Sequence, residues 1–117
     1  MSAFTDARAT IAGKLSAAGV AGVTVDPAAL APFVLVDLVT VDRPAGVGAW
    51  GASVPVKIVV PPPGNAEAAA ALEATLETVL RTLGYAPAVP GVYRGAGDTE
   101  HPSYTLTYPV DIANPDC

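Results

Sequence analysis

Residues 65–84 read NAEAAAALEATLETVLRTLG and form the one long segment with clear helical periodicity. Its large apolar side chains recur at i, i+4, i+7, i+8 and i+11, which places on one stripe of an α-helix Leu72, Leu76, Val79, Leu80 and Leu83. Asn65 can accept from the first free N–H groups of a helix, and Gly84 can adopt the left-handed conformation that ends one. An apolar stripe of this kind packs on a sheet, so the segment predicts a helix that covers one.

The other side of this helix consists almost entirely of alanine, at Ala66, Ala68, Ala69, Ala70, Ala71 and Ala74. Alanine has the highest helix propensity and adds little bulk. Two interpretations stay open: the alanines reflect the codon preferences of a GC-rich genome, or their smooth surface lets a second subunit pack closely.

The remaining elements follow from periodicity and from glycine and proline. A second helix is expected over residues 5–19, with Ile11 and Leu15 on its apolar side and Gly19 at its end. Strands are expected over residues 33–41 (central), 53–60 (half-buried), 85–94 (interrupted by prolines) and 104–112 (edge or end at Pro109), and 23–25 could form a short one. The sequence predicts one α+β domain over 1–117, with a flexible tail at 113–117. Its two helices pack on a mainly antiparallel four-stranded sheet in the order α-β-β-α-β-β.

A long glycine-rich loop is expected over residues 42–52, between two strands that a short turn could otherwise join. The only tryptophan, Trp50, lies in it and either folds back onto the core or projects toward a partner. Asp37 interrupts an apolar strand, so it either faces solvent or is buried beside a partner that the sequence does not identify.

Composition limits the classes of function. The chain of 117 residues is 51% hydrophobic with a mean hydropathy of +0.44, so some apolar surface is expected to be buried between subunits. A net charge of -5 disfavours nucleic-acid binding, although an acidic surface would suit a channel through which DNA slides. No apolar run approaches the about 20 residues of a membrane span, and residues 1–6 do not resemble a secretory signal, so we expect folding in a cytoplasm.

Catalytic and metal-binding patterns are absent from the sequence. One histidine, His101, and one cysteine, Cys117, cannot supply a zinc tetrad, and no nucleophile motif accompanies the histidine. The glycines of residues 46–51 match neither a phosphate-binding loop nor a dinucleotide fingerprint. The sequence therefore predicts a protein that is not an enzyme and has no cofactor and no metal.

The order of elements, the segment ALEATLETVLRTLGY at 71–85 and the closing YTLTYPV at 104–110 resemble the tail terminator proteins of long-tailed phages that infect actinobacteria. The resemblance covers about residues 5–112. It implies a structural virion protein at the head–tail junction, assembled in the host cytoplasm. Such a protein forms a homo-oligomeric ring, expected to be a hexamer, that caps the tail tube, stops its polymerisation and joins the tail to the head-completion proteins. DNA would pass through the ring without specific binding.

The resemblance places contacts with other proteins on the segments that connect strands. We therefore expect assembly interfaces at 43–50 and 93–101, with the candidate residues Arg43, Val47, Trp50, Tyr93, Arg94 and His101. The alternatives are another head–tail connector or tail component, and a small cytoplasmic dimer that binds a ligand near Tyr85 and Tyr104. A degenerate enzyme is a third alternative.

Overall fold

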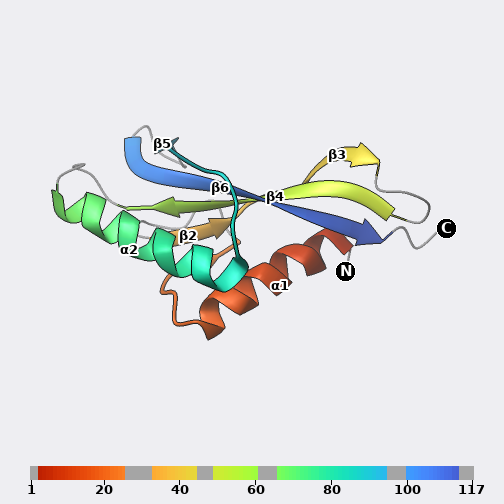
Figure 1. The fold of residues 1–117 in the computed structure, drawn as a ribbon, viewed down its shortest axis with the longest axis horizontal. Helices are drawn as coiled ribbons and strands as arrows, with labels where there is room; N and C mark the ends of the chain where they lie inside the picture. The colour runs from red at the N-terminus through yellow and green to blue at the C-terminus, as the bar shows by residue number, and fades with distance from the viewer. Residues whose placement is uncertain (1–2, 26–32, 45–48, 61–65, 95–99, 114–117) are drawn as a thin grey trace.

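The structure is a computed structural model that describes residues 3–25, 33–44, 49–60, 66–94 and 100–113. Two helices cover one face of a twisted sheet, so the fold has two layers (Figure 1). The elements in chain order are α1 (Ala3–Ala17), β1 (Val23–Thr24), β2 (Phe33–Val36), β3 (Thr40–Pro44), β4 (Ala49–Val59), α2 (Ala66–Leu83), β5 (Ala88–Arg94) and β6 (Glu100–Ala113).

The sheet differs from the expected one. Within the described residues it has six strands: five run in the order β1-β2-β4-β6-β5, and β3 lies beside the first half of β4. The pair β1–β2 is parallel and the other pairs are antiparallel, so the sheet is mixed. The predicted four-stranded antiparallel sheet and the order α-β-β-α-β-β are therefore wrong, although the two helices and the α+β character are confirmed.

The expected central strand over residues 33–41 is interrupted, and Pro55 of the neighbouring strand explains where. Asp37 donates its N–H to the Pro55 carbonyl at 2.9 Å, but proline has no N–H to donate in return. The register shifts by one residue beyond this point. Val36 pairs with Val56 and Thr40 pairs with Ser53, so four residues on the β2–β3 side match only three on β4. One apolar run thus becomes two strands, β2 and β3, that follow each other along β4.

Three further prolines lie on outer edges of the sheet, where a missing N–H breaks no ladder bond. Val60 donates its N–H to the Pro102 carbonyl at 3.2 Å. Backbone groups alternate in direction along an antiparallel strand, so the N–H and C=O groups of even-numbered residues of β6 point toward β4, and those of odd-numbered residues point to the other side of β6. The same alternation in the paired strands directs Pro44, Pro90 and Pro109 outward. Prolines on sheet edges discourage pairing with another chain.

β4 begins at Ala49, much earlier than expected. The predicted loop over 42–52 is therefore wrong for the described residues, since 42–44 and 49–52 lie in strands; residues 45–48 lie outside the described part of the chain. Together β3, residues 49–53 and residues 109–113 form a three-stranded arm. The arm extends the molecule to 50 × 30 × 22 Å and lies at the right of Figure 1.

The core confirms the predicted buried stripe of α2. Leu72 and Val79 are buried, and Leu76, Leu80 and Leu83 pack against the same cluster. Alternate residues of the sheet complete it from the other layer, chiefly Val34, Val36, Val54, Val56, Ile58 and Leu106. The apolar side of α1 is also confirmed, because Ile11 and Leu15 are both buried in this cluster.

Both helices end as the sequence predicts and are tied to the sheet by side chains. Gly19 and Gly84 adopt the expected left-handed conformation, each with φ of 88°. The buried Tyr108 donates its hydroxyl to the Gly84 carbonyl at 3.0 Å. From α1, the Arg8 guanidinium donates to the carbonyls of Val25 and Val36, which lie at the carboxyl ends of β1 and β2.

The other expected elements are confirmed with changed boundaries. The short strand at 23–25 forms as β1, and the interrupted strand at 85–94 forms as the edge strand β5. β6 is longer than expected because it continues through Pro109 to Ala113, so the predicted flexible tail begins inside a strand. Residues 114–117 lie outside the described part of the chain.

Candidate functional site

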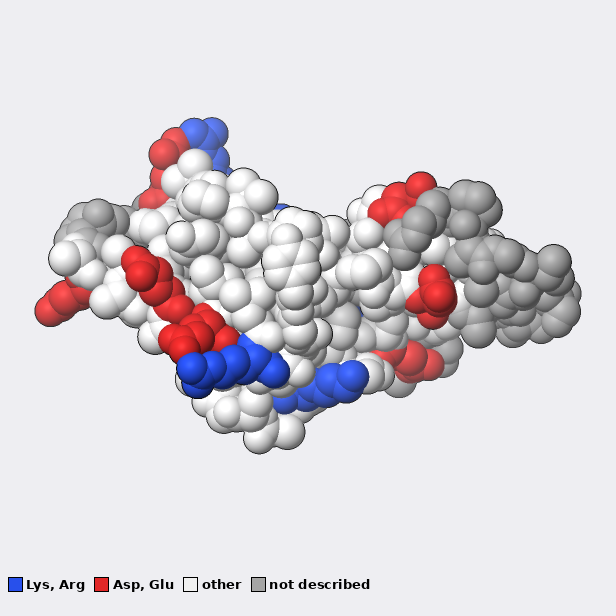
Figure 2. All heavy atoms as spheres, viewed as in Figure 1, with Lys and Arg blue, Asp and Glu red and all other residues white. Residues whose placement is uncertain are grey.

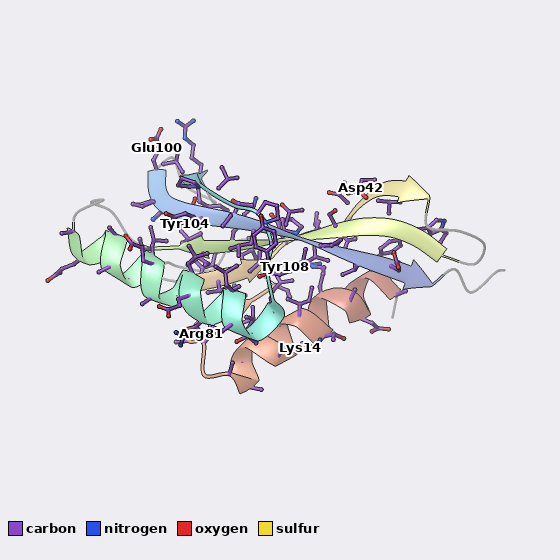
Figure 3. The ribbon with its side chains drawn as sticks, viewed as in Figure 1. Lys14, Asp42, Arg81, Glu100, Tyr104 and Tyr108 are labelled. Atoms are coloured by element: carbon purple, nitrogen blue, oxygen red, sulfur yellow. The ribbon has the colours of Figure 1, made fainter. Side chains whose placement is uncertain are left out.

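The two segments expected to contact other proteins lie at opposite ends of the long axis. Figure 3 labels Glu100 near one end, beside β5, and Asp42 on β3 near the other. The structure thus brings together Tyr93, Arg94 and His101 at the first end and places Arg43 and Trp50 at the second. Val47 lies outside the described residues.

At the arm, Trp50 folds back rather than projecting as a free anchor. Its indole stacks on Phe4 of α1, with ring centroids 5.8 Å apart and an interplanar angle of 10°. The residue is still 36% exposed, so one side of the stacked pair remains open to a partner. Pairing with Pro44 and Ile112 fixes the backbone of Trp50 in the middle strand of the arm. The backbone of Arg43 pairs with Gly51, one position along the same strand pair.

At the opposite end, the Tyr93 ring lies on the sheet face that the helices do not cover. It contacts Phe33 edge to face at 5.5 Å, and the Lys57 ammonium lies 5.7 Å from its centroid. This face carries a second small apolar cluster of Phe33, Leu35 and Val59, against which Tyr93 packs. Tyr93 is therefore largely a packing residue rather than a free contact residue.

Arg94 and His101 lie beside Tyr93 on the same strand pair. Arg94 forms an ion pair with Glu100 directly across from it. His101 pairs with Tyr93, and its buried Nδ1 has no hydrogen-bond partner among the described residues. The described residues of this end therefore present an ion pair and a half-buried imidazole.

Asp37, whose partner the sequence did not identify, pairs with Lys57. Its Oδ2 lies 3.0 Å from the Lys57 Nζ, and its Oδ1 accepts from the Leu38 N–H at 2.8 Å. Burial by itself raises the pKa of Asp37, but these two hydrogen bonds, with the charges of Lys57 and Arg8, outweigh burial and lower the pKa below 3.8. The pair holds the interrupted strand against β4, which is a structural role.

From the sequence, Tyr85 was named only as a neighbour of a possible ligand pocket, and its exposure was not predicted. It is the most exposed aromatic side chain among the described residues, 87% exposed in the connection between α2 and β5. Among the described residues, four large apolar side chains are also more than half exposed: Leu38, Val41, Val89 and Val92. A tyrosine directly after a helix-ending glycine has no periodic neighbours, so nothing in the pattern distinguishes an exposed ring from a buried one.

An open groove of about 460 Å³ lies between α2 and the turn that follows α1. The described residues that line it are small or apolar and carry no charge: Ala18, Gly19, Val20, Ala21, Gly22, Phe33, Val34, Ile58, Val59, Val60, Ala71, Ala74, Thr75 and Thr78. Ala71 and Ala74 belong to the alanine-rich side of α2, so part of that side forms a wall of the groove. The groove is lined by neither Tyr85 nor Tyr104, near which the alternative interpretation expected a ligand pocket.

Charged side chains leave a wide uncharged area in the middle of the face shown in Figure 2. Acidic side chains follow the outer side of α2, where Glu77 pairs with Arg81, and others gather near the arm. The net charge of the chain is -5.

Within the described ranges, no three histidine, cysteine, aspartate or glutamate side chains gather as a metal site would require. No helix in the part of the chain that the structure describes is long and apolar enough to span a membrane. No protein-family model, no curated protein and no solved structure matches this chain.

Proposed function

We propose that this chain is a structural virion protein that forms a ring on the phage tail tube, stops tube polymerisation and joins the tail to the head-completion proteins. The observation that carries the proposal is the separation of the two candidate contact regions. The arm with Trp50 and the β5–β6 end with Arg94 and His101 lie at opposite ends of a 50 Å long subunit. A protein that joins two different assemblies needs two different docking surfaces that face apart.

The two ends differ in chemistry as well as in position. The arm presents Trp50, stacked on Phe4 of α1, whereas the β5–β6 end presents an ion pair and an imidazole. Aromatic anchors contribute strongly to stable interfaces. Exposed ion pairs contribute little affinity but add specificity and speed encounter. We assign the tube contact to the arm and the head-side contact to the β5–β6 end.

Subunit contacts in the ring use side chains rather than shared sheets. Each outward-directed proline, Pro44, Pro90 and Pro109, removes a donor from an edge that strand pairing would use. The contacts therefore lie on surfaces between the two ends. The acidic net charge supports a lumen that DNA passes without binding.

The test is tube capping in vitro. The purified chain is added to a polymerising tail-tube protein from the same genome, and tube lengths and ring-capped ends are counted by negative-stain electron microscopy. We expect capped ends and shorter tubes with the natural chain and with Arg94→Ser, and loss of capping with Trp50→Ser. Tubes of unchanged length without rings at any concentration of the natural chain would contradict the proposed function.

A further inference from the structure

We propose that neighbouring copies of this chain contact each other by inserting Tyr85 of one copy into the groove between α2 and the α1–β1 turn of the next. This inference rests on the proposed ring and adds the residues that hold it together. The occupant of the groove is a second copy of the same chain.

Tyr85 is an exposed ring on an anchored backbone. The preceding Gly84 donates to the Leu80 carbonyl at 2.9 Å and accepts the Tyr108 hydroxyl at 3.0 Å. The following Ala86 is buried in the main core. Because its backbone is held on both sides, the 87% exposed Tyr85 has only its two side-chain torsions to order on binding, which favours it as an interface anchor.

The groove has matching size and chemistry. Its volume of about 460 Å³ falls within the range of sites that enclose aromatic groups, and none of its described lining residues carries a charge. A buried tyrosine needs a partner for its hydroxyl. Thr78 donates its own hydroxyl to the Ala74 carbonyl at 3.2 Å and keeps lone pairs that can accept from the phenol.

The contact must join two copies arranged head to tail. Thr78 and Ala74 precede Tyr85 by seven and eleven residues, which corresponds to about 10 to 16 Å along a helix, so Tyr85 does not reach its own groove. A projection at one place and a hollow at another on the same molecule make a heterologous interface. Such an interface generates a closed ring when the rotation between subunits closes.

Two variants separate the two halves of the contact. Tyr85→Ser removes the ring and keeps the groove, while Ala74→Phe fills the groove and keeps the ring. Both positions are solvent-exposed, so each variant is expected to fold, which circular dichroism checks. Val92→Ser, another exposed apolar residue that does not line the groove, is the matched control.

The readout is mass in solution by light scattering after size exclusion, alone and with tail tubes from the same genome. We expect rings from the natural chain and from Val92→Ser, and about thirtyfold weaker self-association for Tyr85→Ser and for Ala74→Phe. An equimolar mixture of these two variants restores one intact contact per pair and should form complexes of two subunits that grow no further.

Self-association of Tyr85→Ser at natural strength, or a mixture that stays monomeric, would overturn this contact and leave the tube-capping role standing. Binding of a small apolar probe such as an anilinonaphthalene dye in the groove of the assembled ring would also overturn it, because the groove would then be open. A natural chain that remains monomeric with and without tubes contradicts the ring itself.

Discussion

Replacing Arg8 with methionine should release the carboxyl ends of the parallel strand pair. The half-buried guanidinium donates to the Val25 carbonyl at 3.0 Å and to the Val36 carbonyl at 3.2 and 3.3 Å. β1 has only two residues, so little else fixes its end to β2. Methionine keeps much of the packing volume and removes all of these hydrogen bonds.

The expected loss follows from two carbonyls that lose a charged donor. Hydrogen bonds to charged groups contribute about 1.5–3 kcal/mol when buried, and partial exposure lets water replace part of this. We expect a loss of about 1–3 kcal/mol in the free energy of unfolding, which corresponds to about 4 °C in melting temperature per kcal/mol for a chain of this size. Denaturant unfolding followed by circular dichroism measures it.

The matched control for this prediction is Lys14→Met, which removes an exposed cation from the same helix. It should change the free energy of unfolding by less than about 0.5 kcal/mol. Equal free energies of unfolding for the Arg8 and Lys14 variants would show that the hydrogen bonds from Arg8 to the two carbonyls do not stabilise the fold, and that removing Arg8 has only the effect of removing a charge.

Three further predictions test other parts of the structure. Leu15→Ala should cost about 2–5 kcal/mol through a core cavity, whereas Leu38→Ala at a 70% exposed position should cost almost nothing; equal melting temperatures would contradict the assignment of the core. Tyr108→Phe should cost about 0.5–1.5 kcal/mol by freeing the end of α2. Burial raises the pKa of the Tyr108 phenol above 10.0, so the free energy of unfolding of the natural chain should fall as pH rises above that value. The phenylalanine variant should show a smaller fall in alkaline denaturation curves. The pKa of Asp37 is lowered in the folded chain, so the ionised carboxylate stabilises the fold above about pH 4, and this stabilisation is lost as pH falls through the pKa of the folded state. Asp37→Asn should therefore lower the free energy of unfolding at neutral pH and weaken its dependence on pH in acid. A free energy of unfolding that depends on pH as in the natural chain would contradict the pairing with Lys57.

The helices could be predicted from the sequence because their signals are local. The five-residue apolar stripe of α2 and the glycines that end both helices determine face and boundary without reference to the rest of the chain. The strand break at Asp37 could not be predicted, because its cause is Pro55, a residue on another strand. Once the pairing is known, the missing N–H explains the slip in register, but pairing itself is a non-local property.

The candidate contact residues were predicted less well for the same reason. Trp50 was assigned to a loop because of its glycine neighbours, yet long-range pairing with β6 places it in a strand. Tyr93 packs on Phe33, which lies sixty residues earlier in the sequence, and no spacing rule indicates that contact. Tyr85 and the groove became visible only when exposure and the relation of α2 to the α1–β1 turn were known.

The central claim is that this chain forms a ring that caps a tail tube, and its mass in solution tests that claim most directly. Light scattering coupled to size exclusion, over a concentration series with and without tail tubes from the same genome, measures the number of subunits per particle. The account predicts a closed particle of several subunits, six by the family resemblance, that forms alone or on contact with tubes. A monomer or a dimer that does not change across the series and ignores the tubes would contradict it.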